Sequence, residues 1–201
     1  NVLFERYRLD KEKFYVCYAG NIGHLQNIQS LVEAIELVHR QRPVELVIIG
    51  EGALQKKLFE WVGQGERSTF IHLLPWQPPE DMSHVYSLGD IGFVSLRAGV
   101  SKIAFPSKTW MIMAAARPVL CEVEEESELA DILRQFGCGK YVQPANVGDI
   151  ADAIISMYDN KHELDTMGKN GQRYVLEHID KQVSLSKHYE IIKRAYENKH
   201  G

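Results

Sequence analysis

Short apolar runs alternate with segments of helical periodicity along most of the 201 residues, and this alternation constrains the fold more than any other feature of the sequence. The runs are continuous rather than alternately apolar and polar, which is typical of parallel strands covered by helices on both faces. The pattern therefore predicts the α/β fold class, with a parallel six-stranded sheet. The predicted strands are residues 14–19, 45–49, 70–74, 91–96, 119–123 and 140–142.

Apolar residues recur at helical spacing between these strands. In the first such segment Ile28, Leu31, Ile35 and Val38 fall on one helix face, and Pro43 follows the end of the helix. The strand signals stop after residue 158, so residues 159–201 are predicted to form a C-terminal helical tail. Residues 1–13 are predicted to be linker-like, and no internal linker divides residues 1–201 into more than one domain. The predicted helices are residues 28–38, 53–62, 80–87, 107–115, 127–136, 147–158, 162–178 and 181–197.

Composition excludes several functional classes. Hydrophobic residues at 45% and charged residues at 25% are typical of a globular chain. The net charge of −4, with Lys and Arg scattered along the sequence, argues against a nucleic-acid partner. The three cysteines have no CxxC spacing and no Asp-x-Asp pair occurs, so neither a disulfide framework nor a metal site is expected. Without a run of about 20 apolar residues or a signal segment, the predicted location is cytoplasmic.

In a parallel sheet, ligands bind beyond the carboxyl ends of the strands, so the turns there are the candidate sites. The turn after the first strand holds Gly20, Asn21 and Gly23, whose backbone amides are candidates to bind an anion, a plain tight turn being the alternative. Gly50 and Gly52 follow the second strand. They lack the third glycine of a dinucleotide fingerprint, so NAD binding is not supported, and close packing of strand and helix is the simpler explanation.

The loop after the fourth strand leads into a helix and predicts an anion site. Ser107 is a candidate N-cap, the helix N-terminus offers free N–H groups and the positive end of its dipole, and Lys108 adds a full charge. A phosphate would fit this combination. An ordinary helix cap beside a solvated lysine is the alternative. The candidate residues of this loop are Gly99, Val100, Ser101, Lys102, Pro106, Ser107 and Lys108.

Two further residues are weaker candidates. Trp76, just after the third strand, would line a flat pocket for a base or, more commonly, shield the core. Glu128, in an acidic helix start, would accept a hydroxyl of a sugar or ribose, or complement the helix dipole. The sequence has no GxSxG elbow, HExxH pair or GxxxxGK[ST] loop, which counts against hydrolase and P-loop classes.

With these turns in place, the chain resembles over essentially its whole length the C-terminal, donor-binding domain of glycosyltransferase family 4 (group 1) enzymes. These enzymes have the GT-B fold, of which each half is Rossmann-like. The likeness is greatest to the bacterial branch that builds O-antigen and other surface polysaccharides. The stretches that carry it are Tyr18 to Gly23, Leu46 to Gly52, Tyr86 to Gly92, Pro106 to Lys108, Met113 to Leu120, Gly137 to Gly139, Val142 to Pro144 and Asp149 to Ile154.

The resemblance implies a metal-independent site for a nucleoside diphosphate sugar, such as a UDP-sugar, with no cofactor, and retention of configuration. It places the diphosphate over the glycine turn and the helix that Ser107 opens, the base near Pro75 and Trp76, and the sugar near residues 98–101. It also implies an acceptor domain upstream, consistent with a first residue, Asn1, that is not Met. Whether the full-length enzyme lies at the inner face of a membrane stays open.

Two departures from the family pattern concern the same site. Ile103 and Met111 occupy the positions of the usual pair of glutamates, so the usual group that accepts ribose hydroxyls is missing. Asn21 and Gln26 replace the usual Arg and Lys after the first strand. The cationic groups that remain are Lys108, Lys102 and His24.

The sequence thus predicts the donor-binding half of a hexosyl- or N-acetylhexosaminyltransferase, inactive when isolated. It would act on a lipid-linked or saccharide acceptor in the synthesis of cell-surface polysaccharide. Catalytic residues are expected in the upstream domain. The alternatives are a stand-alone nucleotide-binding or interaction module, and a sugar epimerase or phosphorylase of related architecture.

Overall fold

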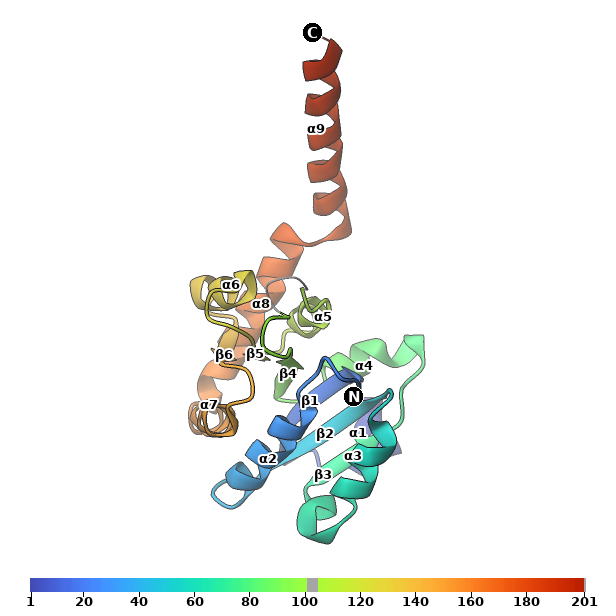
Figure 1. Cartoon of the computed structure of the whole chain (residues 1–201), viewed down its shortest axis with the longest axis vertical. Coiled ribbons are helices and arrows are strands. Elements are labelled where there is room, and N and C mark those ends of the chain that lie inside the picture. The colour runs from blue at the N-terminus through green and yellow to red at the C-terminus, as the bar shows by residue number, and fades with distance from the viewer. Residues whose placement is uncertain (101–104, 201) are drawn as a thin grey trace.

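A computed structural model describes residues 1–100 and 105–200 and contains one sheet of six parallel strands (Figure 1). The strand order is β3-β2-β1-β4-β5-β6, so the direction of winding reverses between β1 and β4. This is the doubly wound, Rossmann-like order, and it confirms the predicted fold class. The strands are β1 (Phe14–Asn21), β2 (Val44–Glu51), β3 (Ile71–Leu74), β4 (Ile91–Ser95), β5 (Val119–Glu122) and β6 (Gly139–Val142).

Helices cover both faces of the sheet. The α-helices are α1 (Val2–Arg6), α2 (Ile28–His39), α3 (Gln55–Val62), α4 (Met82–Tyr86), α5 (Lys108–Ala114), α6 (Glu128–Phe136), α7 (Val147–Asp159), α8 (Leu164–His178) and α9 (Lys181–His200). Short 3₁₀ turns precede β3, α4 and α8, at Gly65–Thr69, Pro79–Asp81 and Lys161–Glu163.

Alternate residues of each strand serve different layers of the core. In β1, Phe14, Val16 and Tyr18 face the layer of α2, α3 and α7, whereas Tyr15 and Cys17 face the layer of α1 and α4. The β4 and β5 half of that second face packs against α5, α6 and α8. Both faces of the strands are therefore buried, which explains why their sequences are continuously apolar.

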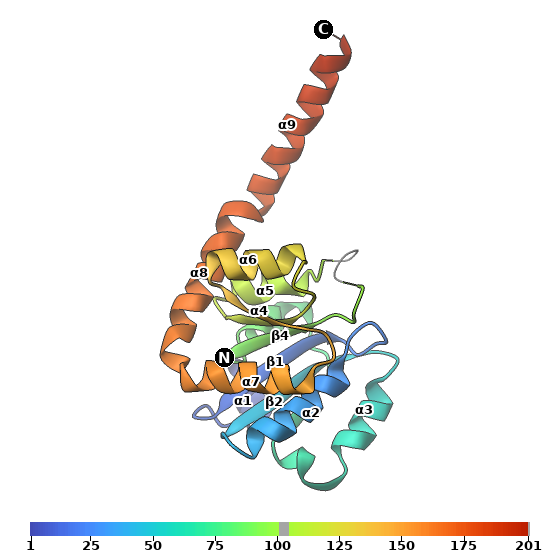
Figure 2. The same cartoon turned by 60° about the vertical axis from the view of Figure 1, so that its left-hand side comes forward.

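The two tail helices differ in their surroundings. Helix α8 packs on the body, since a Cβ atom at Gly171 would lie 3.1 Å from the Cγ atom of Met113 in α5. Helix α9 points away from the body in both views (Figures 1 and 2). Four large apolar side chains at helical spacing form a stripe along α9. They are exposed to solvent, with 60% of Leu185, 65% of Tyr189, 67% of Ile192 and 66% of Tyr196 accessible. Part of the predicted tail is thus an integral layer of the domain.

The prediction that residues 1–13 are linker-like is wrong for their first half. Residues 2–6 form helix α1, and the side chain of Leu3 is fully buried against the layer that includes Tyr15 and Val47. The Asn1 side chain accepts a hydrogen bond from the Leu3 N–H group and donates one of 2.7 Å to the His84 carbonyl. One short turn of helix gives too few residues for a periodic signal, so the sequence pattern missed it.

If α1 belongs to the core, truncating Leu3 should destabilise the domain. We expect Leu3→Ala to lower the free energy of unfolding by about 2 to 5 kcal/mol, because it leaves a cavity in a buried layer. Val2→Ala is the matched control. Its side chain is 45% exposed, and we expect a change of about 0.5 kcal/mol or less. Urea denaturation of both variants measures the difference, and equal effects would contradict the integral role of α1.

Candidate functional site

Glycines face each other at the carboxyl ends of β1 and β2. Gly20 pairs with Gly50 in the ladder, and the register continues to Asn21 opposite Glu51. A Cβ atom at Gly50 would overlap the Gly20 carbonyl group. Gly50 is therefore needed for contact between the two strands, and a side chain at Gly20 would instead project outward from the sheet, away from β2.

Lys108 lies across this open backbone. A Cβ atom at Gly20 would lie 2.9 Å from Cδ and 3.1 Å from Nζ of Lys108, and closer still to its Cε atom. Lys108 is the first residue of α5, and α5 is fixed on the sheet where Ile112 packs against the bare Cα of Gly92 in β4. The contact between β4 and α5 thus positions an ammonium group above the end of β1.

The turns that follow β1 and β2 are joined by backbone hydrogen bonds. The Ile22 N–H group donates to the Glu51 carbonyl over 2.8 Å, and the Leu54 N–H group donates to the Ile22 carbonyl over 2.9 Å. Gly52, with a φ of +152°, lies against Ile22, and a Cβ atom there would lie 2.6 Å from the Asn21 Oδ1 atom. Gly23 is similarly crowded by the Asn21 side-chain amide. These hydrogen bonds and contacts between the two turns fix the backbone at Asn21.

Trp76 is presented by a segment that α1 anchors. The buried side chain of Gln77 donates from Nε2 to the Tyr7 hydroxyl over 2.8 Å and to the Pro75 carbonyl over 2.6 Å. Its Oε1 atom accepts a hydrogen bond of 3.0 Å from Arg6, which also pairs with Asp81. With its neighbour held in this way, Trp76 remains 41% exposed at the end of β3.

These features meet in a pocket of about 190 Å³ at the carboxyl edge of the sheet. It combines an ammonium group and exposed backbone, which bind an anion, with a carboxylate, which binds hydroxyls, and an aromatic face, which binds a flat ring. The pocket lies beside the reversal of strand order between β1 and β4, where open α/β sheets bind ligands. Its lining residues are Gly20, Asn21, Glu51, Trp76 and Lys108.

The loop after β4 is held from the side of β5. Gly99 has a φ of +82°, and its N–H group donates to a carboxylate oxygen of Glu124. The Val100 N–H group donates to the Arg97 carbonyl over 3.0 Å. Ser101, which was predicted to lie near the sugar, and Lys102, a predicted cationic group of the site, lie outside the described residues. Gly99 and Val100 are not among the residues that line the Gly20 pocket.

The prediction that Ser107 caps α5 is wrong. Its φ of −54° and ψ of −24° are already helical, and its side chain makes no capping hydrogen bond. The turn starts at Pro106, whose carbonyl accepts from the Thr109 N–H group over 3.0 Å. Since a capping side chain requires an extended backbone, the early turn removes that geometry. Glu128 is the exposed first residue of α6 and does not line the Gly20 pocket.

A buried carboxylate lies beneath the same edge of the sheet. Glu122, the last residue of β5, is fully buried and accepts hydrogen bonds from the Ser95 hydroxyl (2.5 Å), the Asn27 side-chain amide (2.8 Å) and the Ala145 N–H group (2.5 Å). The Ser95 hydroxyl also accepts from the Asn27 N–H group over 2.8 Å. Glu122 therefore ties the start of α2 to the ends of β4 and β5. Burial raises its pKa, and the donors oppose that rise.

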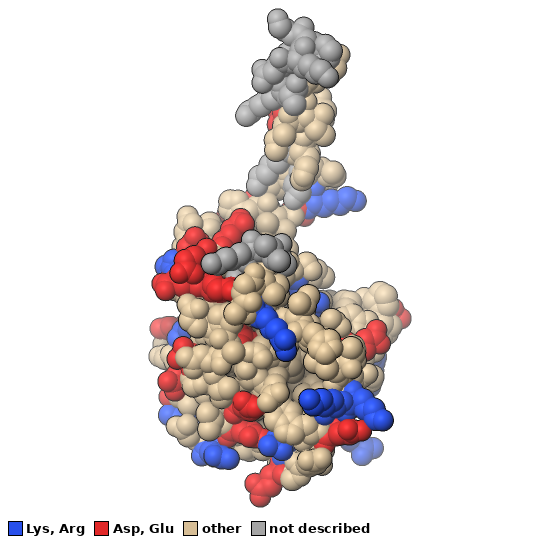
Figure 3. Space-filling model, in the orientation of Figure 1, with Lys and Arg blue, Asp and Glu red and all other residues tan. Residues whose placement is uncertain are grey.

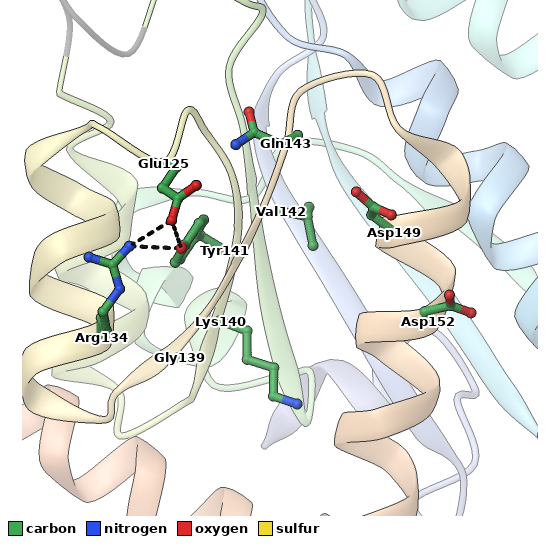
Figure 4. A pocket seen from close by; sticks show the side chains of 9 residues that line it. All are labelled: Glu125, Arg134, Gly139, Lys140, Tyr141, Val142, Gln143, Asp149 and Asp152. Carbon is green, nitrogen blue, oxygen red and sulfur yellow. Dashed lines mark hydrogen bonds and ion pairs between the residues drawn. The ribbon is translucent and has the colours of Figure 1, made fainter.

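A larger pocket, of about 590 Å³, lies along the free edge of the sheet at β6. Figure 4 shows that Arg134, Glu125 and Tyr141 bond to one another on one wall, with Asp149 and Asp152 of α7 opposite. The Arg134 guanidinium donates to the Tyr141 hydroxyl over 2.7 Å, so its charge is already partnered. This pocket is far from the reversal of strand order, and size alone does not make it the better candidate. The remaining lining residues are Gly139, Lys140, Val142 and Gln143.

Surface charge varies over the face shown in Figure 3. Acidic side chains gather at the start of α6, where the sequence carries Glu124, Glu125, Glu126 and Glu128, and basic and acidic groups are interspersed elsewhere on this face. Within residues 1–100 and 105–200, no cluster of three or more His, Cys, Asp or Glu side chains is arranged to hold a metal ion. In the same residues, no helix has the length and apolar character that crossing a membrane requires.

The family model described as glycosyl transferases group 1 matches residues 2–174. The chain belongs to this family. It is 29% identical over 174 residues to a Pseudomonas aeruginosa protein named as a glycosyltransferase, WbjE, covering 85% of this chain and 42% of that protein. It is 26% identical over 147 residues to an Escherichia coli K12 protein named as a colanic acid biosynthesis glycosyl transferase, WcaI, covering 73% and 36%. The chain thus spans less than half the length of these curated relatives.

Solved glycosyltransferase structures share the fold. The Anabaena protein HepE, solved in complex with UDP, superposes with a TM-score of 0.80 at 13% identity, covering 96% of this chain and 51% of that one. The C-terminal domain of the group 1 glycosyl transferase LpcC from Francisella tularensis gives a TM-score of 0.72 at 18% identity, covering 88% and 91%. The Rossmann-like sheet of this chain therefore matches GT-B glycosyltransferases in architecture.

Two acidic residues of this region were not among the sequence candidates. Glu51 lines the Gly20 pocket, and Glu122 holds the loops beneath it. A signal for Glu51 was present, because a carboxylate between Gly50 and Gly52 stands at the end of a predicted strand. Glu122 has a weaker signal: a charged residue within the apolar run 119–123 indicates a buried polar partner.

The raised pKa of Glu122 predicts a specific pH dependence of stability. Since its folded pKa lies above the ordinary value of 4.5, the folded state binds the proton more tightly than the unfolded state does. The resulting stabilisation is complete below pH 4.5 and is lost as the pH rises through the folded pKa. We therefore expect the stability of the wild type, relative to Glu122→Gln, to increase as the pH falls from 8 towards 4.5.

Urea denaturation of both proteins across this pH range measures the difference and removes the contribution of the other carboxylates. A stability difference that is independent of pH would contradict the assignment. Glu125→Gln, which alters a surface carboxylate of the β6 pocket, is the control.

Proposed function

We propose that this chain is the donor-binding domain of a glycosyltransferase that moves a hexosyl or N-acetylhexosaminyl group from a nucleoside diphosphate sugar to a lipid-linked or saccharide acceptor. The observation that carries the proposal is the position of Lys108 across Gly20, in a pocket shared with Trp76. Family membership supports sugar transfer, and the UDP complex of a protein with the same fold supports the donor class. The names of the two curated relatives support a role in cell-surface polysaccharide synthesis.

Each part of the pocket has a role in this proposal. The Lys108 ammonium and the backbone at Gly20 bind the diphosphate, and Trp76 supplies a face for the base. As the bond between sugar and diphosphate breaks, negative charge develops on the leaving phosphate. A fixed ammonium at that point stabilises the transition state more than the ground state. The proposal requires neither a metal ion nor a covalent nucleophile from this chain, and it includes retention of configuration as in the resembling family.

The acceptor side of the reaction is assigned to a domain upstream in the same polypeptide. This chain aligns with only 42% and 36% of the lengths of the two curated relatives, which is roughly what one domain of a two-domain enzyme would cover. These shares support the assignment. The exposed stripe of Leu185, Tyr189, Ile192 and Tyr196 on α9 is an apolar surface of the kind that another domain covers. The proposed location of the enzyme is the cytoplasm, with the full-length protein at the inner face of the membrane.

Calorimetric titration with UDP, GDP and ADP tests the donor site. We expect Lys108→Ala to weaken binding of the nucleoside diphosphate by about 1 to 3 kcal/mol and to leave the nucleoside almost unaffected, because the lost charge faces the phosphates. The control is Lys169→Ala on α8, whose ammonium pairs with Asp165 and whose neighbour Gly168 packs against Ala116, in the connection that leads into the amino end of β5.

Equal losses for nucleotide and nucleoside would contradict the phosphate assignment. Binding should persist in EDTA, and a strict requirement for Mg²⁺ or Mn²⁺ would contradict the metal-independent site. If none of the three diphosphates binds, an interaction module without donor binding becomes the better explanation.

A transfer assay tests the two-domain proposal. With a matched donor and acceptor, we expect the longer polypeptide to transfer sugar and residues 1–201 alone to bind donor without transfer, because positioning the two substrates together provides much of the catalysis. Efficient transfer by residues 1–201 alone would overturn the assignment of a separate acceptor half.

A further inference from the structure

We propose that Glu51 binds the ribose of the nucleotide and makes the site selective for ribonucleotides over deoxyribonucleotides. This inference rests on the proposed function, since it assumes that the Gly20 pocket binds a nucleoside diphosphate. It adds a residue and a specificity that neither the sequence candidates nor the family match assigns.

The order of groups along the edge of the sheet supports the assignment. Strands β3, β2 and β1 are neighbours in that order, and at their carboxyl ends they present Trp76, Glu51 and Gly20. Lys108 covers Gly20. The pocket thus runs from an aromatic face through a carboxylate to a cation. A nucleoside diphosphate has a flat base, a hydroxylated ring and an anion in the same order, so the carboxylate is placed to meet the ribose.

The backbone of Glu51 is fixed although its side chain is exposed. Its carbonyl accepts the hydrogen bond of 2.8 Å from the Ile22 N–H group, and it pairs with Asn21 at the end of the ladder between β1 and β2. Gly52 follows with a φ of +152°, held against Ile22. The Cα position of Glu51 is therefore set by the same contacts between β1, β2 and their turns that set Gly20. Only the Glu51 side chain needs to move on binding.

The chemistry of Glu51 suits hydroxyl groups rather than the diphosphate. Among residues 1–100 and 105–200, its carboxylate has no hydrogen-bond or ion-pair partner, and Lys108 is not close enough to form an ion pair with it. An ionised carboxylate only accepts hydrogen bonds, and the ribose hydroxyls are donors of the right kind. It would also repel a phosphate, which favours the diphosphate at the Lys108 end of the pocket.

Paired nucleotides test the proposal directly. Affinities of UDP and 2′-deoxy-UDP, and likewise of GDP and ADP with their 2′-deoxy forms, are measured by calorimetry for the wild type, Glu51→Ala and Glu51→Gln. We expect the wild type to bind the ribonucleotide about tenfold more tightly, because a hydroxyl hydrogen bond to a charged group is lost in the deoxy form. Glu51→Ala should bind both forms equally, and Glu51→Gln, which keeps an acceptor oxygen, should retain part of the preference.

The control is Glu60→Gln on α3, an exposed carboxylate near Lys56 that does not line the pocket, and it should keep the full preference. A preference for the ribonucleotide that survives in Glu51→Ala would overturn the assignment. Tighter binding of UDP by Glu51→Ala would also overturn it, because that result would show that Glu51 only repels the phosphates. Failure of the proposed function gives a different result: the wild type would bind none of the diphosphates, and this inference would fall with it.

Discussion

The contact between Gly20 and Gly50 is the constraint on which the candidate site depends. Because neither residue has a side chain, β1 and β2 stay paired to their last residues, and the outer side of Gly20 is free for Lys108 to lie across it. Any larger residue at position 20 would displace the lysine, and any larger residue at position 50 would separate the strands. The position of one ammonium group thus follows from two missing side chains on neighbouring strands.

Support for the site comes from parts of the chain that are distant in sequence. Gln77 holds the segment that presents Trp76, and it is itself held by Arg6 and Tyr7 of the N-terminal segment. On the other side, Glu122 joins the start of α2 to the ends of β4 and β5. Both Gln77 and Glu122 are buried polar groups whose hydrogen bonds are satisfied. Removing one group from such a network lowers the free energy of unfolding by more than one hydrogen bond contributes, because the remaining group stays buried without a hydrogen-bond partner.

The sequence predicted the fold well because the strands are buried on both faces, so each appears as an apolar run bounded by turn residues. It also predicted that Gly20, Asn21, Trp76 and Lys108 belong to turns at one edge of the sheet, and the structure places them around one pocket. The cap assigned to Ser107 was wrong because a backbone angle, not a residue type, decides capping. The hydrogen bond between Arg6 and Gln77 joins residues 71 positions apart, and no local pattern predicts it.

The central claim is that a nucleotide binds at the edge formed by β1, β2 and β3. A crystal structure of residues 1–201 with UDP tests it most directly. The account predicts that the diphosphate contacts Lys108 and the backbone at Gly20, that the base lies on Trp76, and that the ribose lies beside Glu51. A nucleotide bound instead in the larger pocket along β6, between Arg134 and Asp149, would contradict it.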